Sequence, residues 1–119
     1  MQTTAITTLN PLQLQAFSGH SWDVDALHRN PAGAALILSV DRQASSAGKR
    51  ALAGRIWRLS ALCGARLEAW QPHQLGVVGV RALVHQIRNA RKADGSSWSA
   101  AYQAAHETAL AGVLDACWE

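Results

Sequence analysis

The sequence predicts an α-rich α+β fold in a single globular domain spanning residues 1–119. The length suits one hydrophobic core and leaves little room for a second. The hydrophobic fraction of 49% and charged fraction of 16% are typical of an ordered chain. Short apolar runs bounded by turn residues alternate with longer segments of helical period. An all-α fold is the alternative, because Ala and Leu are abundant and every predicted strand is short.

Three short strands form the predicted sheet. Residues 3–9 are rich in Thr and Ile and end before Pro11. Residues 34–40, AALILSV, are an unbroken apolar run, as expected of a strand buried on both faces. Residues 65–70 alternate apolar and charged side chains before Pro72. We expect this sheet to be covered by helices.

The first two predicted helices span 21–29 and 47–63. Ser21 is the expected N-cap of the first, which has aspartates in its first turn. The second precedes Gly64, a typical C-cap residue. Its apolar positions recur at helical spacing, at Leu52, Ile56, Leu59 and Cys63.

Two further helices are predicted at 79–92 and 97–118. The former has one apolar stripe, formed by Val80, Leu83, Val84 and Ile87. The sequence leaves open whether residues 65–80 form strand or helix. The segment 97–118 is Ala-rich with few charges, so it is either buried or half of a homo-oligomer contact.

Charge is strongly segregated along the chain. Residues 42–92 hold ten of the eleven Lys and Arg residues and a single acid, giving a net charge of +9. Residues 1–41 carry a net −2 and residues 93–119 a net −4, within a total of +3. The middle of the chain is therefore a basic body between two acidic ends, which favours an anionic partner.

The candidate binding residues lie on the two central helices. Basic side chains recur at i, i+4, i+7 and i+11 along 79–92, and a second group lies on 47–63 beside a tryptophan. Each stripe alone is also typical of the polar face of an amphipathic helix. The assigned residues are Lys49, Arg50, Arg55, Trp57, Arg58, Arg81, His85, Arg88, Arg91 and Lys92. Trp57 and Trp118 are the candidate interface anchors.

These features predict a small non-enzymatic binding or regulatory protein, such as an accessory factor or inhibitor from a bacterium or mobile element. Its basic helical face would engage an acidic protein or ribonucleoprotein surface. One alternative is direct nucleic-acid binding through phosphate contacts of helices 49–58 and 79–92. Another is a small enzyme using the His and Asp residues clustered at 20–28.

The remaining motifs are not specific enough to predict a nucleotide-binding or metal site. The segment 43–50 resembles a phosphate-binding loop, but Gln43 and Arg50 stand where that motif needs Gly and Ser or Thr. A capped turn or a simple anion nest is the expectation there. The two cysteines, Cys63 and Cys117, lack metal-ligand spacing and are expected to be reduced and packed as apolar residues.

No cofactor, metal site or catalytic residue is assigned from the sequence. The first residues lack the basic and apolar regions of a secretory signal, and no apolar run has the length of a membrane span. We therefore expect a cytoplasmic protein without a membrane partner.

Overall fold

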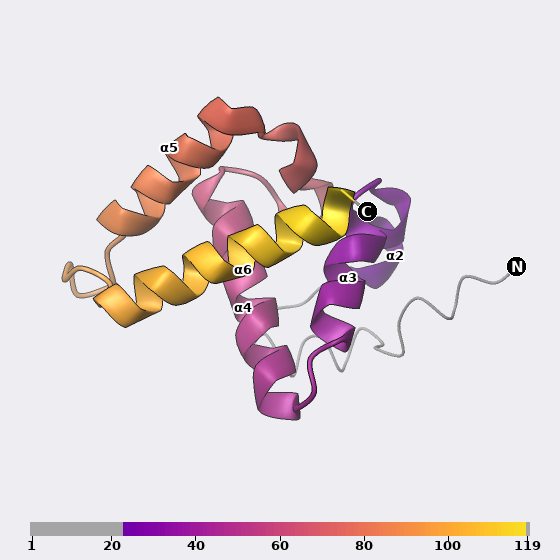
Figure 1. Ribbon diagram of the computed structural model, residues 1–119, viewed down its shortest axis with the longest axis horizontal. Coiled ribbons are helices and arrows are strands. Elements are labelled where there is room, and N and C mark those ends of the chain that lie inside the picture. Colours follow the sequence, from indigo (N-terminus) through magenta and orange to yellow (C-terminus); the bar gives the residue numbers. More distant parts are fainter. Residues whose placement is uncertain (1–22, 119) are drawn as a thin grey trace, which may run out of the picture.

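All regular structure that the computed structural model describes, over residues 23–118, is helical (Figure 1). The side chains of Val24 and Trp118 lie outside this description. The helices are α2 (Val24–Arg29), α3 (Gly33–Asp41), α4 (Ser46–Leu62), α5 (Gly76–Asn89) and α6 (Ala100–Trp118). Two short 3₁₀ turns, η2 (Leu67–Ala69) and η3 (Pro72–Gln74), connect α4 to α5.

The prediction of a central strand at 34–40 was wrong, because these residues belong to the helix α3. Leu36, Ile37 and Val40 are fully buried on one side of that helix. A short apolar run fits a buried strand and a buried helix equally well. The preceding alanines and the leucines favour the helix, since they have higher helix propensity than β-branched residues.

The prediction of a strand at 65–70 was also wrong. Leu67 and Trp70 are both buried while Ala69 is exposed, which is the spacing of a helical turn rather than of a strand. The predicted strand at 3–9 lies outside the described residues. The all-helical alternative therefore fits the described part of the chain, and the small sheet is unsupported there.

The four predicted helices are present with shifted ends. Asp23, rather than Ser21, caps α2, and its carboxylate accepts a hydrogen bond from the amide of Ala26 at 3.0 Å. The segment 65–80, which the sequence left open, forms two 3₁₀ turns and the start of α5. α5 begins at Gly76, whose φ of +68° lets the chain turn into the helix. It ends at Asn89, before the predicted end at Lys92.

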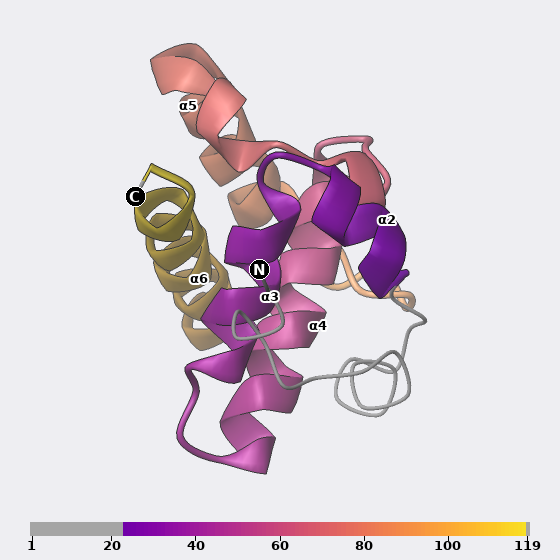
Figure 2. The same ribbon diagram turned by 90° about the vertical axis from the view of Figure 1, so that its right-hand side faces the viewer.

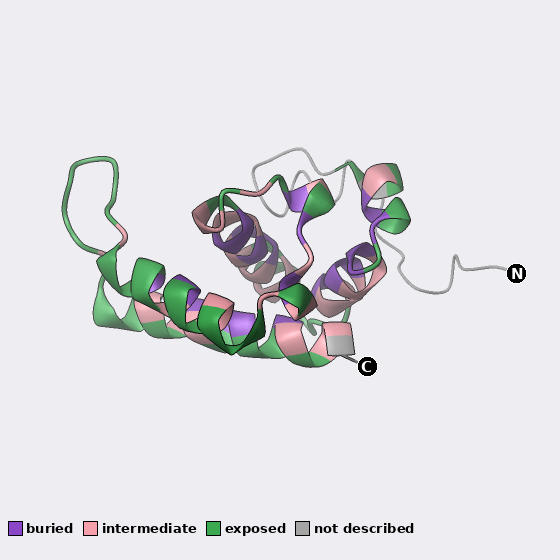
Figure 3. Cartoon of the chain, turned by 90° about the horizontal axis from the view of Figure 1, so that it is seen from above, coloured by how far each residue is buried: buried purple, intermediate pink, exposed green. Residues whose placement is uncertain are grey.

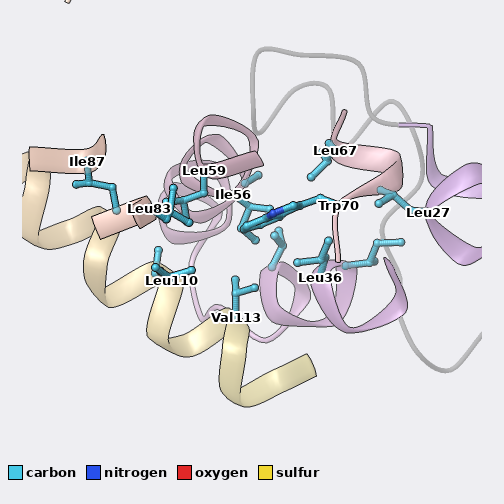
Figure 4. Packing of buried hydrophobic residues seen from close by; sticks show 14 residues of the cluster. Leu27, Leu36, Ile56, Leu59, Leu67, Trp70, Leu83, Ile87, Leu110 and Val113 are labelled. Atoms are coloured by element: carbon cyan, nitrogen blue, oxygen red, sulfur yellow. The ribbon is translucent and has the colours of Figure 1, made fainter. Parts of the chain in front are cut away.

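α6 crosses both α3 and α4 on one face of the molecule (Figures 1 and 2). α5 packs against α6 and α4. The side chains between these helices form one apolar cluster, in which Trp70 lies among residues of several elements (Figure 4). Its labelled neighbours there include Leu27 of α2, Leu36 of α3, Ile56 of α4 and Val113 of α6.

One buried hydrogen bond ties distant segments around this core. The side-chain amide of Asn30 donates to the Trp70 carbonyl at 2.7 Å, across 40 residues of sequence. The same side chain accepts from the amide of Ala32 at 3.4 Å, so it also shapes the link between α2 and α3. Within residues 23–118, no helix combines the length and apolar character needed to cross a bilayer.

Candidate functional site

Helix α5 presents a continuous exposed basic face. Arg81, His85 and Arg88 are exposed and recur at i, i+4 and i+7, while Leu83 and Ile87 are buried on the opposite side. Two apolar side chains share the exposed face at its N-terminal end: Val77 is 69% exposed and Val78 is 82% exposed. They are two of the three large hydrophobic side chains that are exposed among the described residues, the third being Tyr102.

The connection from α5 to α6 continues the basic face beyond the helix. Arg91 and Lys92 are exposed, as is almost the whole of the connection (Figure 3). Arg91 and Ser97 form an isolated antiparallel bridge, and the Arg91 guanidinium donates to the Ser97 hydroxyl. The two basic side chains therefore lie on a closed turn. The sequence had predicted that they lie on a helix.

Acids beside this face include Asp94 of the connection, and Glu107 and Asp115 of α6, of which Asp115 lines a groove together with Val77 and Arg81. Ser96 donates to the Asp94 carboxylate through its hydroxyl at 2.6 Å and its amide at 2.9 Å. These hydrogen bonds lower the pKa of Asp94. Glu107 of α6 accepts from the Nε of Arg88 at 3.3 Å, in a salt bridge that links α5 to α6.

The structure separates the α4 candidates from this face and gives each a different role. Lys49 turns back to the end of α3, where its ammonium donates to the Asp41 carbonyl at 2.9 Å and contacts the carboxylate at 3.4 Å. Arg50 is exposed. Arg55 lines a groove between helices. Trp57 is half-buried and packs against the core.

Arg58 is engaged inside the protein. Its Nε donates to Nε2 of His106 at 2.9 Å, and its guanidinium lies over the Tyr102 ring, 5.3 Å from the centroid. Partial burial lowers the pKa of Arg58, and proximity to Tyr102 opposes that change. Sequence analysis assigned Arg58 to the basic surface because it could not show this partner 48 residues away.

His106 was missed by the sequence analysis. It is fully buried and belongs to a group of three rings, in which Trp98 and Tyr102 each lie 4.6 Å from it between centroids. The spacing of these residues, i, i+4 and i+8, was the available signal, since it places them on one side of a helix. Burial is the largest cause that lowers the pKa of His106.

Two grooves border α6. One, of about 600 Å³, lies between α3, α4 and α6 and has Arg55 and Asp115 among its lining residues. The other, of about 590 Å³, lies between α6 and the start of α5 and is lined by Val77, Val80 and Arg81 among others. Val77, one of the two exposed valines of α5, therefore also borders the second groove.

The remaining sequence motifs have simple structural roles in the described residues. The Ser45 hydroxyl accepts from the amide of Gly48 at 2.9 Å, so the segment that resembles a phosphate loop is a capped helix start. Of the 20–28 cluster, Asp25 and His28 are exposed on α2, while His20 lies outside the described residues. No three His, Cys, Asp or Glu side chains within 23–118 come together as metal ligands.

No family model matches the sequence, and neither the curated proteins nor the solved structures compared with it gave a similar one.

Proposed function

We propose that the protein is a non-enzymatic binding or regulatory protein whose α5 face engages an acidic surface on a protein or ribonucleoprotein. The observation that carries this proposal is the presence of exposed valines and exposed basic side chains on the same side of one helix. Arginine is among the residues that contribute most at protein interfaces, and adjacent exposed apolar side chains add surface that a partner can bury. No acid lies between residues 69 and 93, so the acids that approach this face, Glu107 and Asp115, come from α6.

The exposed valines favour a protein partner over bare nucleic acid. Phosphate contacts need only cations, and binding of single strands adds aromatic side chains on which bases stack. The aromatic residue once expected beside the basic stripe, Trp57, packs against the core instead. A phosphate backbone offers no apolar surface against which Val77 and Val78 could pack. A protein surface that is both acidic and apolar would contact the valines as well as the basic side chains.

The test compares the intact protein with an Arg81→Glu, Lys92→Glu double variant. These positions are exposed, and neither side chain forms a salt bridge with a described residue. Arg29→Glu is the matched control, because Arg29 is an exposed helical residue of α2, far from α5 in Figure 1. Capture from nuclease-treated source lysate is the first measurement, and binding of random-sequence RNA and DNA across a salt series is the second.

We expect a specific protein to be captured by the intact chain and the control, and lost with the double variant. Val78→Asp should reduce capture as well, because it removes an apolar anchor and adds an acid to the face. Nucleic-acid binding that weakens steeply with salt, with a smaller slope in the double variant, would support the alternative of direct nucleic-acid binding. Equal capture by the double variant and the intact chain would refute the proposed protein-binding face.

A further inference from the structure

We propose that a second copy of this chain docks along α6, in the groove that α6 forms with α3 and α4. This groove has a volume of about 600 Å³. Arg42 and Arg55 lie on its α3 and α4 side, and Asp115 lies on its α6 side. The remaining α6 residues that line it have small or medium side chains: Ala105, Thr108, Ala109, Gly112, Val113 and Ala116.

The outward face of α6 differs from that of an ordinary surface helix. Surface helices present charged and polar side chains to water opposite their buried stripe. The exposed side of α6 instead carries Ala101, Ala104, Thr108, Ala111, Gly112 and Asp115, with one charge among them. The other acid of the helix, Glu107, is engaged by Arg88. The face beside the groove is therefore narrow, smooth and almost uncharged.

The residues along this face repeat at the spacing of paired helices. Ala101, Ala105, Thr108, Gly112 and Asp115 follow one another at intervals of four, three, four and three. Read in the opposite direction from Thr108, the helix places small side chains at nearly the same spacings. In an antiparallel pair, Ala105 therefore faces Gly112 of the second copy, and small side chains meet at each level. Such contacts allow helix axes to approach to about 8 Å, the lower end of the usual range.

The charged residues of the groove also favour α6 of a second copy as its occupant. Neither Arg55 nor Asp115 forms a salt bridge with any described residue, although both line this groove. In the antiparallel arrangement, Asp115 of the second copy falls opposite Ala101, one helical turn from Ala105, which lines the groove together with Arg55. Two-fold symmetry makes this pairing twice. The groove and the helix that would fill it are thus complementary in charge.

The area that two α6 helices can bury against each other explains why the dimer would also need the groove. A helix of 19 residues is about 28 Å long, and a stable interface buries about 1,200–2,000 Å². A pair of helices with such small side chains falls short of that area unless neighbouring elements take part. Leu52 and Gln43 line the same groove and would add to the contact.

The test is the association state of the full chain by analytical ultracentrifugation over a dilution series. We expect a dimer that dissociates on dilution, and Gly112→Lys should raise its dissociation constant by roughly tenfold or more. A Cβ added at Gly112 meets no atom within 4 Å in the single chain. Because Lys also favours the helix over Gly, the thermal stability of the variant monomer should not fall. Ala82→Lys, at an exposed position of α5, is the control and should leave association unchanged.

A charge exchange tests the pairing itself. Asp115→Arg should weaken the dimer, and combining it with Arg55→Asp should restore association, with circular dichroism confirming helical content in each variant. A chain that stays monomeric at its highest soluble concentration overturns the proposal, as does a dimer insensitive to Gly112→Lys. Failure of the double variant to recover association contradicts the antiparallel register. None of these measurements depends on binding at α5, so this proposal can fail or hold independently of the proposed function.

Discussion

Arg58 Nε donates a hydrogen bond to Nε2 of His106 at 2.9 Å, and this contact fixes the protonation of a fully buried imidazole. Since Nε2 accepts, the single ring proton of the neutral form is on Nδ1, which donates to the Tyr102 carbonyl at 2.8 Å. Both ring nitrogens are therefore satisfied only while His106 is neutral. The contact joins the C-terminal part of α4 to the first half of α6.

Replacing Arg58 with Met should destabilise the fold. The substitution keeps most of the aliphatic stem but leaves Nε2 of His106 buried without a donor, at a cost of about 1–3 kcal/mol. Urea unfolding measures the change. Arg50→Met, on an exposed position of the same helix, is the control and should stay within about 0.5 kcal/mol of the intact protein. Similar losses for both variants would show that the buried contact contributes nothing special.

Folding stability should decline in acid because of His106. Burial and the nearby Arg58 and Arg55 lower the pKa of His106 below its ordinary value of 6.5, so the unfolded chain takes up this proton first. The contribution is present above pH 6.5 and is lost as the pH falls from 6.5 through the lowered pKa. Unfolding in urea at a series of pH values measures the slope. We expect a shallower slope for His106→Gln than for the intact protein.

Asn30→Ala should also destabilise the protein. It removes the donor to the buried Trp70 carbonyl and the acceptor for the Ala32 amide, so we expect a loss of about 1–3 kcal/mol. Asn30→Asp keeps an acceptor for Ala32 but places a carboxylate oxygen against the Trp70 carbonyl, and it should cost at least as much. Thermal unfolding of both variants provides the comparison. An Asp variant as stable as the intact protein would rule out the buried bond to Trp70.

Two glycines in helices should respond to Ala in opposite ways. A Cβ at Gly33 would overlap the backbone of Leu27, so Gly33→Ala should cost about 1–3 kcal/mol through forced separation of α2 and α3. A Cβ at Gly112 meets open space in the single chain, so Gly112→Ala should stabilise dilute protein by about 0.5–1 kcal/mol. Calorimetry at low protein concentration measures both. A Gly33→Ala variant as stable as the intact protein would contradict the close approach of α2 to α3, and a destabilising Gly112→Ala would contradict the open space at Gly112.

Both thiols should react slowly in the native protein. Cys63 and Cys117 are free and half-buried, and burial raises the pKa of each, which reduces the fraction of reactive thiolate. Titration with a disulfide reagent near neutral pH should therefore give slow modification in the native state and fast modification in urea. Rapid labelling of either cysteine without denaturant would show that its surroundings open readily.

The sequence predicted the helices better than the strands, for a physical reason. Long segments with a clear period, such as 47–63, were placed to within one residue because their apolar stripe extends over several turns. The segments 34–40 and 65–70 are too short for their period to separate helix from strand. Tertiary packing decides such cases, and packing against α4 and α6 is visible only in the folded chain.

The candidate site was predicted in part. Exposure of Arg81, His85 and Arg88 on one side of α5 agrees with the predicted basic stripe, although the helix ends before Lys92. The roles of Lys49 and Arg58 could not be predicted, because charge and spacing along one helix do not reveal a partner on another. Whether any of the ten assigned residues binds a partner remains a prediction.

The salt bridge between Arg88 and Glu107 has a consequence for selectivity. Glu107 occupies, within the same molecule, the position that a carboxylate of an incoming partner would take on Arg88. An acidic ligand would compete with this internal carboxylate for Arg88. Weak or isolated acids therefore receive little from Arg88, whereas a surface that also satisfies Arg81 and covers Val77 recovers the lost contact elsewhere on α5.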